Sequence, residues 1–232
     1  MMAFSDEYRE VEADGNTKLH VIHTNDKKKM ATSIVQYERH LRLQHHKIVG
    51  IDLEYNDKPE ATQKPALVQL SVGKTQPVLL FQMSVTERCT IFDNFLADPR
   101  YTFACFSIDG DKTRLEHVNL EVANFVDIHK EWTVPEVTKE LNSLGDVSGM
   151  LIDDYYNNMK KKISDEEHRN WADLPLSMRH IEYAAKDTYA TFKIWNHITL
   201  TQDGLRRAKL EKEEPHQEAP QEQLGRLCLV KK

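Results

Sequence analysis

Apolar and polar residues alternate in several short stretches of the first half of the chain, and this alternation is typical of half-buried β-strands. The most regular stretch is IVGIDLEY, and two further apolar runs follow it after short connections. These three runs therefore predict an antiparallel meander. The expected strands are Lys18–Thr24, Ile48–Tyr55, Pro65–Val72, Pro77–Gln82, Tyr101–Ile108 and Asn124–Ile128.

Apolar residues spaced three and four apart separate these strands and dominate the second half of the chain, which predicts helices. The order of elements indicates an α/β fold in which a mixed sheet of five to six strands is flanked by helices. Residues 1–17 are expected to be a polar leader, 18–200 one domain, and 201–232 a flexible tail rich in charge, Gln and Pro. The expected helices cover 29–44, 85–97, 135–143, 147–159 and 178–198, with another opening at Asp109–Asp111.

The composition of the chain favours a globular intracellular protein. With 40% hydrophobic and 29% charged residues the chain is globular, and a net charge of −6 argues against wrapping long nucleic acid through bulk charge. Three distant cysteines, Cys89, Cys105 and Cys228, form no CxxC motif, which favours a reducing intracellular location, nuclear or cytoplasmic. We also expect no secretory signal, because the N-terminus carries acids and no apolar h-region. No membrane span is expected either, because no apolar run approaches the roughly 18 residues that a membrane helix needs.

Candidate chemistry begins in the strand IVGIDLEY. Alternation places Gly50, Asp52 and Glu54 on one face, and two acids on an otherwise apolar strand are costly to bury without a compensating charge. A divalent cation would compensate, and Gly50 would leave room for a ligand to approach. The alternative is a half-exposed strand with one polar face.

Two other segments carry acids that could belong to the same site. Asp111 follows an apolar strand at a strand-to-helix junction, where ligands often bind. Helix capping is the alternative for this segment, although Asp109 fits the cap better. Tyr183 and Asp187 are four residues apart and so share a helical face, at the border of an apolar stripe. A packed tyrosine beside an exposed aspartate would explain that pair equally well.

Taken together, these motifs resemble the DEDD exonuclease superfamily in its tyrosine-bearing branch, DEDDy, and within it the Werner-type exonuclease domains and their plant relatives. The resemblance covers roughly residues 18–200 and implies a ribonuclease H-like fold. Two positions depart from the family pattern: His180 stands where relatives usually carry glutamine, and Tyr55 where many carry tryptophan. The matching segments are DLE at 52–54, GD at 110–111 and YAAKD at 183–187, supported by ALVQLS at 66–71, Asp127, Trp171 and Leu176.

The resemblance implies a 3′–5′ exonuclease acting on the 3′ end of DNA or RNA with two divalent cations, Mg²⁺ or Mn²⁺. Asp52 would bridge both ions, Glu54 and Asp187 would complete one site, and Asp111 would support the other. Tyr183 would orient the attacking water. A non-catalytic nucleic-acid-binding or protein adaptor that retains the fold is the alternative, and the sequence predicts no oligomeric state.

Substrate contacts are also implied. Leu53 would wedge against the terminal base, and Lys112, Arg114 and Lys186 flank the acids and could meet phosphates. For these three cations the alternative is that they are solvated surface charges.

Overall fold

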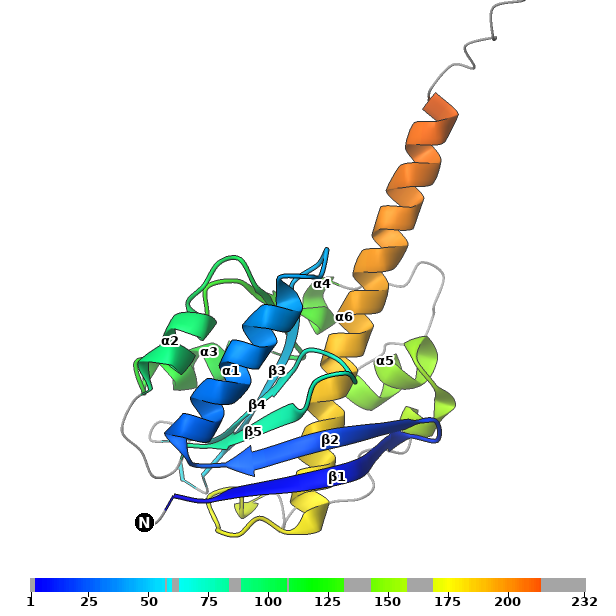
Figure 1. The fold of residues 1–232 in the computed structure, drawn as a ribbon. Coiled ribbons are helices and arrows are strands. Elements are labelled where there is room, and N and C mark those ends of the chain that lie inside the picture. The colour runs from blue at the N-terminus through cyan, green and yellow to red at the C-terminus, as the bar shows by residue number, and fades with distance from the viewer. Residues whose placement is uncertain are drawn as a thin grey trace, which may run out of the picture. The chain divides into compact units, whose positions relative to one another are not determined.

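The computed structural model describes residues 3–56, 58–59, 63–83, 89–107, 109–131, 143–157 and 169–213 (Figure 1). Contacts divide the chain into two units, Met1–Thr199 and Leu200–Lys232. The predicted helix at 135–143 lies almost entirely outside the described residues. Among the described residues, none of the helices combines the length and the apolar content that a membrane-spanning segment needs.

The described part of the first unit contains one mixed sheet of seven strands in the order β1-β2-β5-β4-β3-β6-β7. The central strands β3, β4 and β5 form the predicted antiparallel meander, while β2 pairs with β5, and β3 with β6, in parallel. The strands are β1 Ser5–Asp14, β2 Thr17–Thr24, β3 Ile48–Tyr55, β4 Pro65–Ser71, β5 Val78–Gln82, β6 Thr102–Cys105 and β7 Phe125–Asp127.

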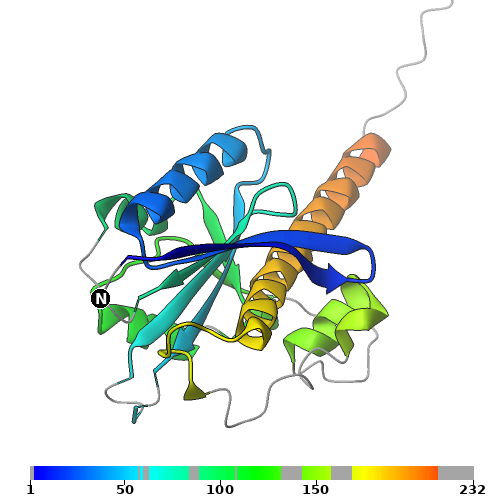
Figure 2. The ribbon, with the colours of Figure 1, turned by 60° about the horizontal axis from the view of Figure 1, so that its bottom comes forward.

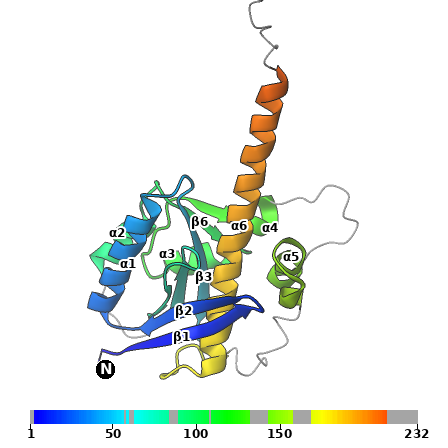
Figure 3. The ribbon, with the colours of Figure 1, turned by 45° about the vertical axis from the view of Figure 1, so that its right-hand side comes forward.

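Helices cover both faces of the sheet, as the α/β pattern predicts (Figures 2 and 3). Helices α1 and α2 pack on one face, where Ile34 and Phe92 belong to the same buried cluster as Ile51. Helix α6 packs on the other face, where most of its apolar stripe is buried as expected from residue spacing, while Phe192 and Trp195 are partly buried. The helices are α1 Lys27–Leu41, α2 Thr90–Leu96, α3 Asp109–Glu116, α4 Ile128–Glu131, α5 Leu144–Leu151 and α6 Met178–Glu213.

Two boundaries differ from the sequence-based expectation. The expected polar leader contains β1, which pairs with β2 and buries Val11 and Ala13, so the sheet has seven strands instead of five to six. Helix α6 continues to Glu213, into the expected tail, because residues 200–213 contain no proline and a single glycine. Residues 214–232 lie outside the described part.

Candidate functional site

The acids of β3 lie on the face of the sheet that α6 covers. Ile51 and Leu53 belong to the core on the α1 side, so the alternation of the strand directs Asp52 and Glu54 to the opposite side. Gly50 is on that same side and contacts the backbone of α6. The predicted assignment of residues to the two faces of IVGIDLEY is therefore confirmed.

Close packing of α6 against the sheet depends on Gly50. A Cβ atom built at Gly50 would lie 2.3 Å from the carbonyl oxygen of Thr188 and 2.8 Å from the backbone nitrogen of Phe192. The hydroxyl of Thr188 donates a hydrogen bond of 3.2 Å to the carbonyl oxygen of Gln69 in β4. The space beside the acids that we assigned to a ligand is thus filled by α6, and that interpretation of Gly50 is wrong.

This packing places the acid of α6 beside those of β3. Asp187, next to Thr188, is buried, and Tyr183 one turn earlier hydrogen-bonds with it. Burial raises the pKa of the Tyr183 hydroxyl, and the nearby charges of Asp187 and Glu54 raise it further. Tyr183 therefore keeps its proton at neutral pH.

The ring of Tyr183 packs against Trp171, with ring centroids 6.0 Å apart in a tilted arrangement. Trp171 also contacts His180, at 4.6 Å in an edge-on arrangement, and the His180 ring is within 2.7 Å of the Ser177 hydroxyl. His180 thus supports the aromatic packing around Tyr183.

Asp111 reaches the site from α3, which follows the parallel strand β6. The hydroxyl of Tyr55, the last residue of β3, donates a hydrogen bond to Oδ1 of Asp111. Burial raises the pKa of Asp111 to about 6, although the Tyr55 hydrogen bond and the charge of Arg114 oppose the rise. The side chain of Asp109 is outside the described residues, so the capping role remains a prediction.

The four acids repel one another. Burial raises the pKa of Asp52 well above its usual range, and Asp187 and then Asp111 add to the rise. Burial is also the main reason why the pKa of Glu54 is raised, and the charges of Asp52, Asp187 and Asp111 raise it further, in that order. Among the described residues, no three of these acids bring ligand oxygens within 4.8 Å of one another, as expected for like charges at low dielectric. The structure therefore gathers four carboxylates, and burial and mutual repulsion raise the pKa values of Asp52 and Glu54 among them.

Gln69 is a site residue that we did not single out from the sequence. It pairs with Asp52 across β3 and β4, its side chain is fully buried, and its amide opposes the rise in the pKa of Glu54 that burial and the other acids cause. The signal was present in ALVQLS, because an uncharged polar residue inside an otherwise apolar strand needs a polar neighbour.

The structure is compatible with only some of the substrate contacts that the resemblance implies. Leu53 is buried in the core on the α1 side, directed away from the acids, so the wedge role is not supported. Lys186 is only 4% exposed and donates a 3.3 Å hydrogen bond to the Tyr155 hydroxyl, which contradicts both a solvated charge and an open phosphate contact. Lys112 is exposed, as either interpretation requires.

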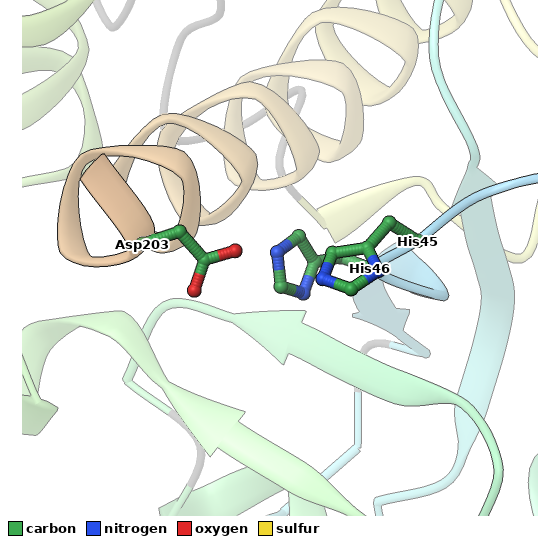
Figure 4. Close-up of side chains that lie close together, drawn as sticks. All are labelled: His45, His46 and Asp203. Atoms are coloured by element: carbon green, nitrogen blue, oxygen red, sulfur yellow. The ribbon is translucent and has the colours of Figure 1, made fainter. Parts of the chain in front are cut away.

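Two histidines precede β3. The rings of His45 and His46 meet edge-on with centroids 4.5 Å apart (Figure 4). Asp203, which Figure 4 also labels, belongs to the second unit, and there its carboxylate lies 3.8 Å from the guanidinium of Arg206.

The raised pKa of Asp111 predicts a pH effect on stability. Its ordinary pKa is 3.8, and burial raises it to about 6 in the fold. Between these values the folded state retains the proton that the unfolded state has released, so the free energy of unfolding falls as the pH rises. Denaturant unfolding with a chelator should show this fall relative to Asp111→Asn, which lacks the titrating group. A difference between the two proteins that is constant over this range would contradict the prediction.

Comparison with known families gave a match to a model described as 3′-5′ exonuclease, over residues 30–202. The match includes Asp52, Glu54, Asp111, Tyr183 and Asp187. Comparison with curated proteins gave no significant match.

Solved structures share the fold. The chain is similar to Escherichia coli RNase D, with a TM-score of 0.57 and 15% identity, covering 86% of this chain and 51% of that one. It is also similar to the Aedes aegypti Nibbler EXO domain, with a TM-score of 0.53 and 14% identity over 77% of this chain and 91% of that one. Brucella melitensis NrnC gives a TM-score of 0.53 and 19% identity over 72% and 78% of the two chains. The ribonuclease H-like fold implied by the sequence is thereby confirmed.

Proposed function

Because this chain belongs to the 3′–5′ exonuclease family, we propose that it removes nucleotides from the 3′ end of DNA or RNA by hydrolysis that depends on two divalent cations held by Asp52, Glu54, Asp111 and Asp187. Enzymes of this family generally use divalent metal ions. The observation that carries the proposal is the convergence of four mutually repelling carboxylates from β3, α3 and α6. The narrower resemblance to Werner-type exonuclease domains remains a prediction.

The donor set fits Mg²⁺ or Mn²⁺. Its ligands are all carboxylate oxygens, which hard cations prefer, whereas histidine or cysteine would favour zinc. The raised pKa values of Asp52 and Glu54, caused first by burial and then by neighbouring acids, indicate that added positive charge would stabilise the ionised site. When bound, two such ions supply a hydroxide nucleophile at neutral pH and compensate the charge on the leaving 3′ oxygen.

The side chains of the site have two roles: the four acids would hold the cations, and Tyr183 would orient the attacking water. By the family resemblance, Asp52 would be shared by both cations, with Glu54 and Asp187 completing one position and Asp111 the other. Tyr183 holds its proton because burial and then Asp187 raise its pKa, so it serves as a hydrogen-bonding group that orients the attacking water and does not remove its proton.

The Tyr183→Phe variant should lose roughly 100-fold in turnover, the lower end of what a positioned proton-handling group contributes. Its affinity for Mn²⁺ should stay unchanged, because the phenol is not a ligand. Tyr189→Phe is the matched control, since Tyr189 lies on the same helix and its hydroxyl bonds with Thr17 instead. Single-turnover rates and Mn²⁺ titration of both variants check this expectation, and full activity of Tyr183→Phe would refute the role.

The proposed function is tested with 5′-labelled DNA and RNA oligomers of one sequence, incubated with Mg²⁺ or Mn²⁺. We expect stepwise shortening from the 3′ end of at least one of them, and none with a chelator. The ratio of the shortening rates for DNA and RNA shows whether the enzyme prefers deoxyribose or ribose. Binding of both oligomers without shortening, or cuts inside them, would contradict the proposal, and binding alone would favour an adaptor.

A further inference from the structure

Three residues connect Asp111 to the end of β3, and together with Asp111 we call them the Asp111 cradle. Tyr55 donates its hydroxyl to Oδ1 of Asp111, and the two residues are 56 positions apart in the chain. The guanidinium of Arg114, one turn after Asp111 on α3, lies over the Tyr55 ring at 4.5 Å. Gln63 accepts a 2.8 Å hydrogen bond from Nε of Arg114. The cradle therefore consists of Tyr55, Gln63, Asp111 and Arg114.

The cradle is anchored to the hairpin that joins β3 and β4. The amide nitrogen of Gln63 donates a 3.3 Å hydrogen bond to the carbonyl oxygen of Asn56, the residue after Tyr55. Contacts thus run from the backbone beside Tyr55 through Gln63 and Arg114 and return to the Tyr55 ring. This closed set of contacts restricts the rotation of the phenol, and with it the direction from which Asp111 receives its hydrogen bond.

Asp111 differs from the other three acids in how it is held. Asp52 and Glu54 are fixed by the pleat of β3, and Asp187 by the packing of α6 on Gly50. Asp111 instead sits in the first turn of a short helix of eight residues. Its side chain consequently depends on a hydrogen-bonded neighbour for its orientation, and the structure provides Tyr55 as that neighbour.

From this geometry we infer that Tyr55 is a positioning residue, which orients the Asp111 carboxylate toward Asp52 for cation binding. Its hydroxyl engages Oδ1 of that carboxylate. The inference rests on the proposed function, because it concerns the same site.

The Tyr55→Phe variant removes one oxygen atom and keeps the ring on which Arg114 stacks. Groups that orient metal-ligating side chains typically contribute about 10- to 100-fold to metal affinity. We therefore expect the weaker of the two Mn²⁺ sites to lose about tenfold in affinity, and the lost turnover to return at saturating Mn²⁺. Tyr101→Phe is the control, since Tyr101 is a buried tyrosine that packs on Phe95 just before β6 begins, and the acids that act on it are Glu38 and Asp98.

A double-mutant cycle separates orientation of Asp111 from a general loss of structure. Free Mn²⁺ is followed by electron paramagnetic resonance during titration of the wild type, Tyr55→Phe, Asp111→Asn and the double variant. If Tyr55 acts through Asp111, Tyr55→Phe weakens binding in the wild-type background and has no further effect with Asn at 111. An equal effect in both backgrounds, or Mn²⁺ affinity of Tyr55→Phe equal to the wild type, would overturn the inference.

Thermal unfolding of the four metal-free proteins runs beside the titrations, so that any unfolded variant is recognised. If the wild type binds Mn²⁺ and shortens oligomers while Tyr55→Phe matches it, the positioning role alone is rejected. If the wild type neither binds Mn²⁺ nor shortens any oligomer, the proposed function itself is rejected.

Discussion

Asp52→Asn is expected to lose roughly 1,000-fold or more in exonuclease rate, because Asp52 is the acid assigned to both cations and each cation contributes several kcal/mol to transition-state stabilisation. The amide has the same shape and no charge, so the fold should persist. The rate is measured on a 5′-labelled oligomer at saturating Mn²⁺. Activity of this variant close to that of the wild type would contradict the assignment.

The same substitution should raise the melting temperature of the metal-free protein. Burial and the charges of Asp187 and Asp111 raise the pKa of Asp52, so its ionised form destabilises the fold when no cation is present. Asp26→Asn is the control, because Asp26 caps α1 through a 2.8 Å hydrogen bond from Lys28 that asparagine can also accept. We expect this control to change neither activity nor melting temperature. A lower melting temperature for metal-free Asp52→Asn would refute the electrostatic account.

Gly50→Ala is expected to destabilise the protein by about 3 kcal/mol or more, and to abolish activity. The added Cβ would overlap the backbone of α6 at Thr188 and Phe192, and backbone atoms cannot rotate away as a side chain does. Displacement of α6 would also carry Asp187 and Tyr183 away from the acids of β3. Denaturant unfolding and oligomer digestion measure the two effects.

Gly15→Ala is the control for this substitution, because a Cβ at Gly15 meets no atom within 4 Å. It should change stability by less than about 1 kcal/mol. If Gly50→Ala is as stable and as active as Gly15→Ala, then close contact between α6 and β3 does not hold the site together.

Local sequence patterns predicted the parts of the site that depend on one element at a time. The period of two in IVGIDLEY assigns Asp52 and Glu54 to one face, and the spacing of four places Tyr183 beside Asp187. Both relations follow from backbone geometry alone. Sequence patterns therefore left open only which elements cover these faces of β3 and α6.

Contacts between distant elements were not predictable in this way. Nothing local indicates that Tyr55 bonds with Asp111, or that α6 occupies the space above Gly50. Lys186 was misjudged for the same reason, since its burial depends on Tyr155, 31 positions away. Strand β1 was missed because SDEYREVEAD is charged, and at the sheet edge only a few of its side chains, such as Val11, need to be apolar.

The central claim is that Asp52, Glu54, Asp111 and Asp187 together hold two cations beside a 3′ end. Crystals of the protein with Mn²⁺ and a short oligonucleotide, measured at a wavelength where Mn²⁺ scatters anomalously, test this most directly. We predict two anomalous peaks about 2.1 Å from oxygens of these four carboxylates, with the 3′-terminal phosphodiester next to them. No peak there at saturating Mn²⁺, or peaks bound by other residues, would contradict the account.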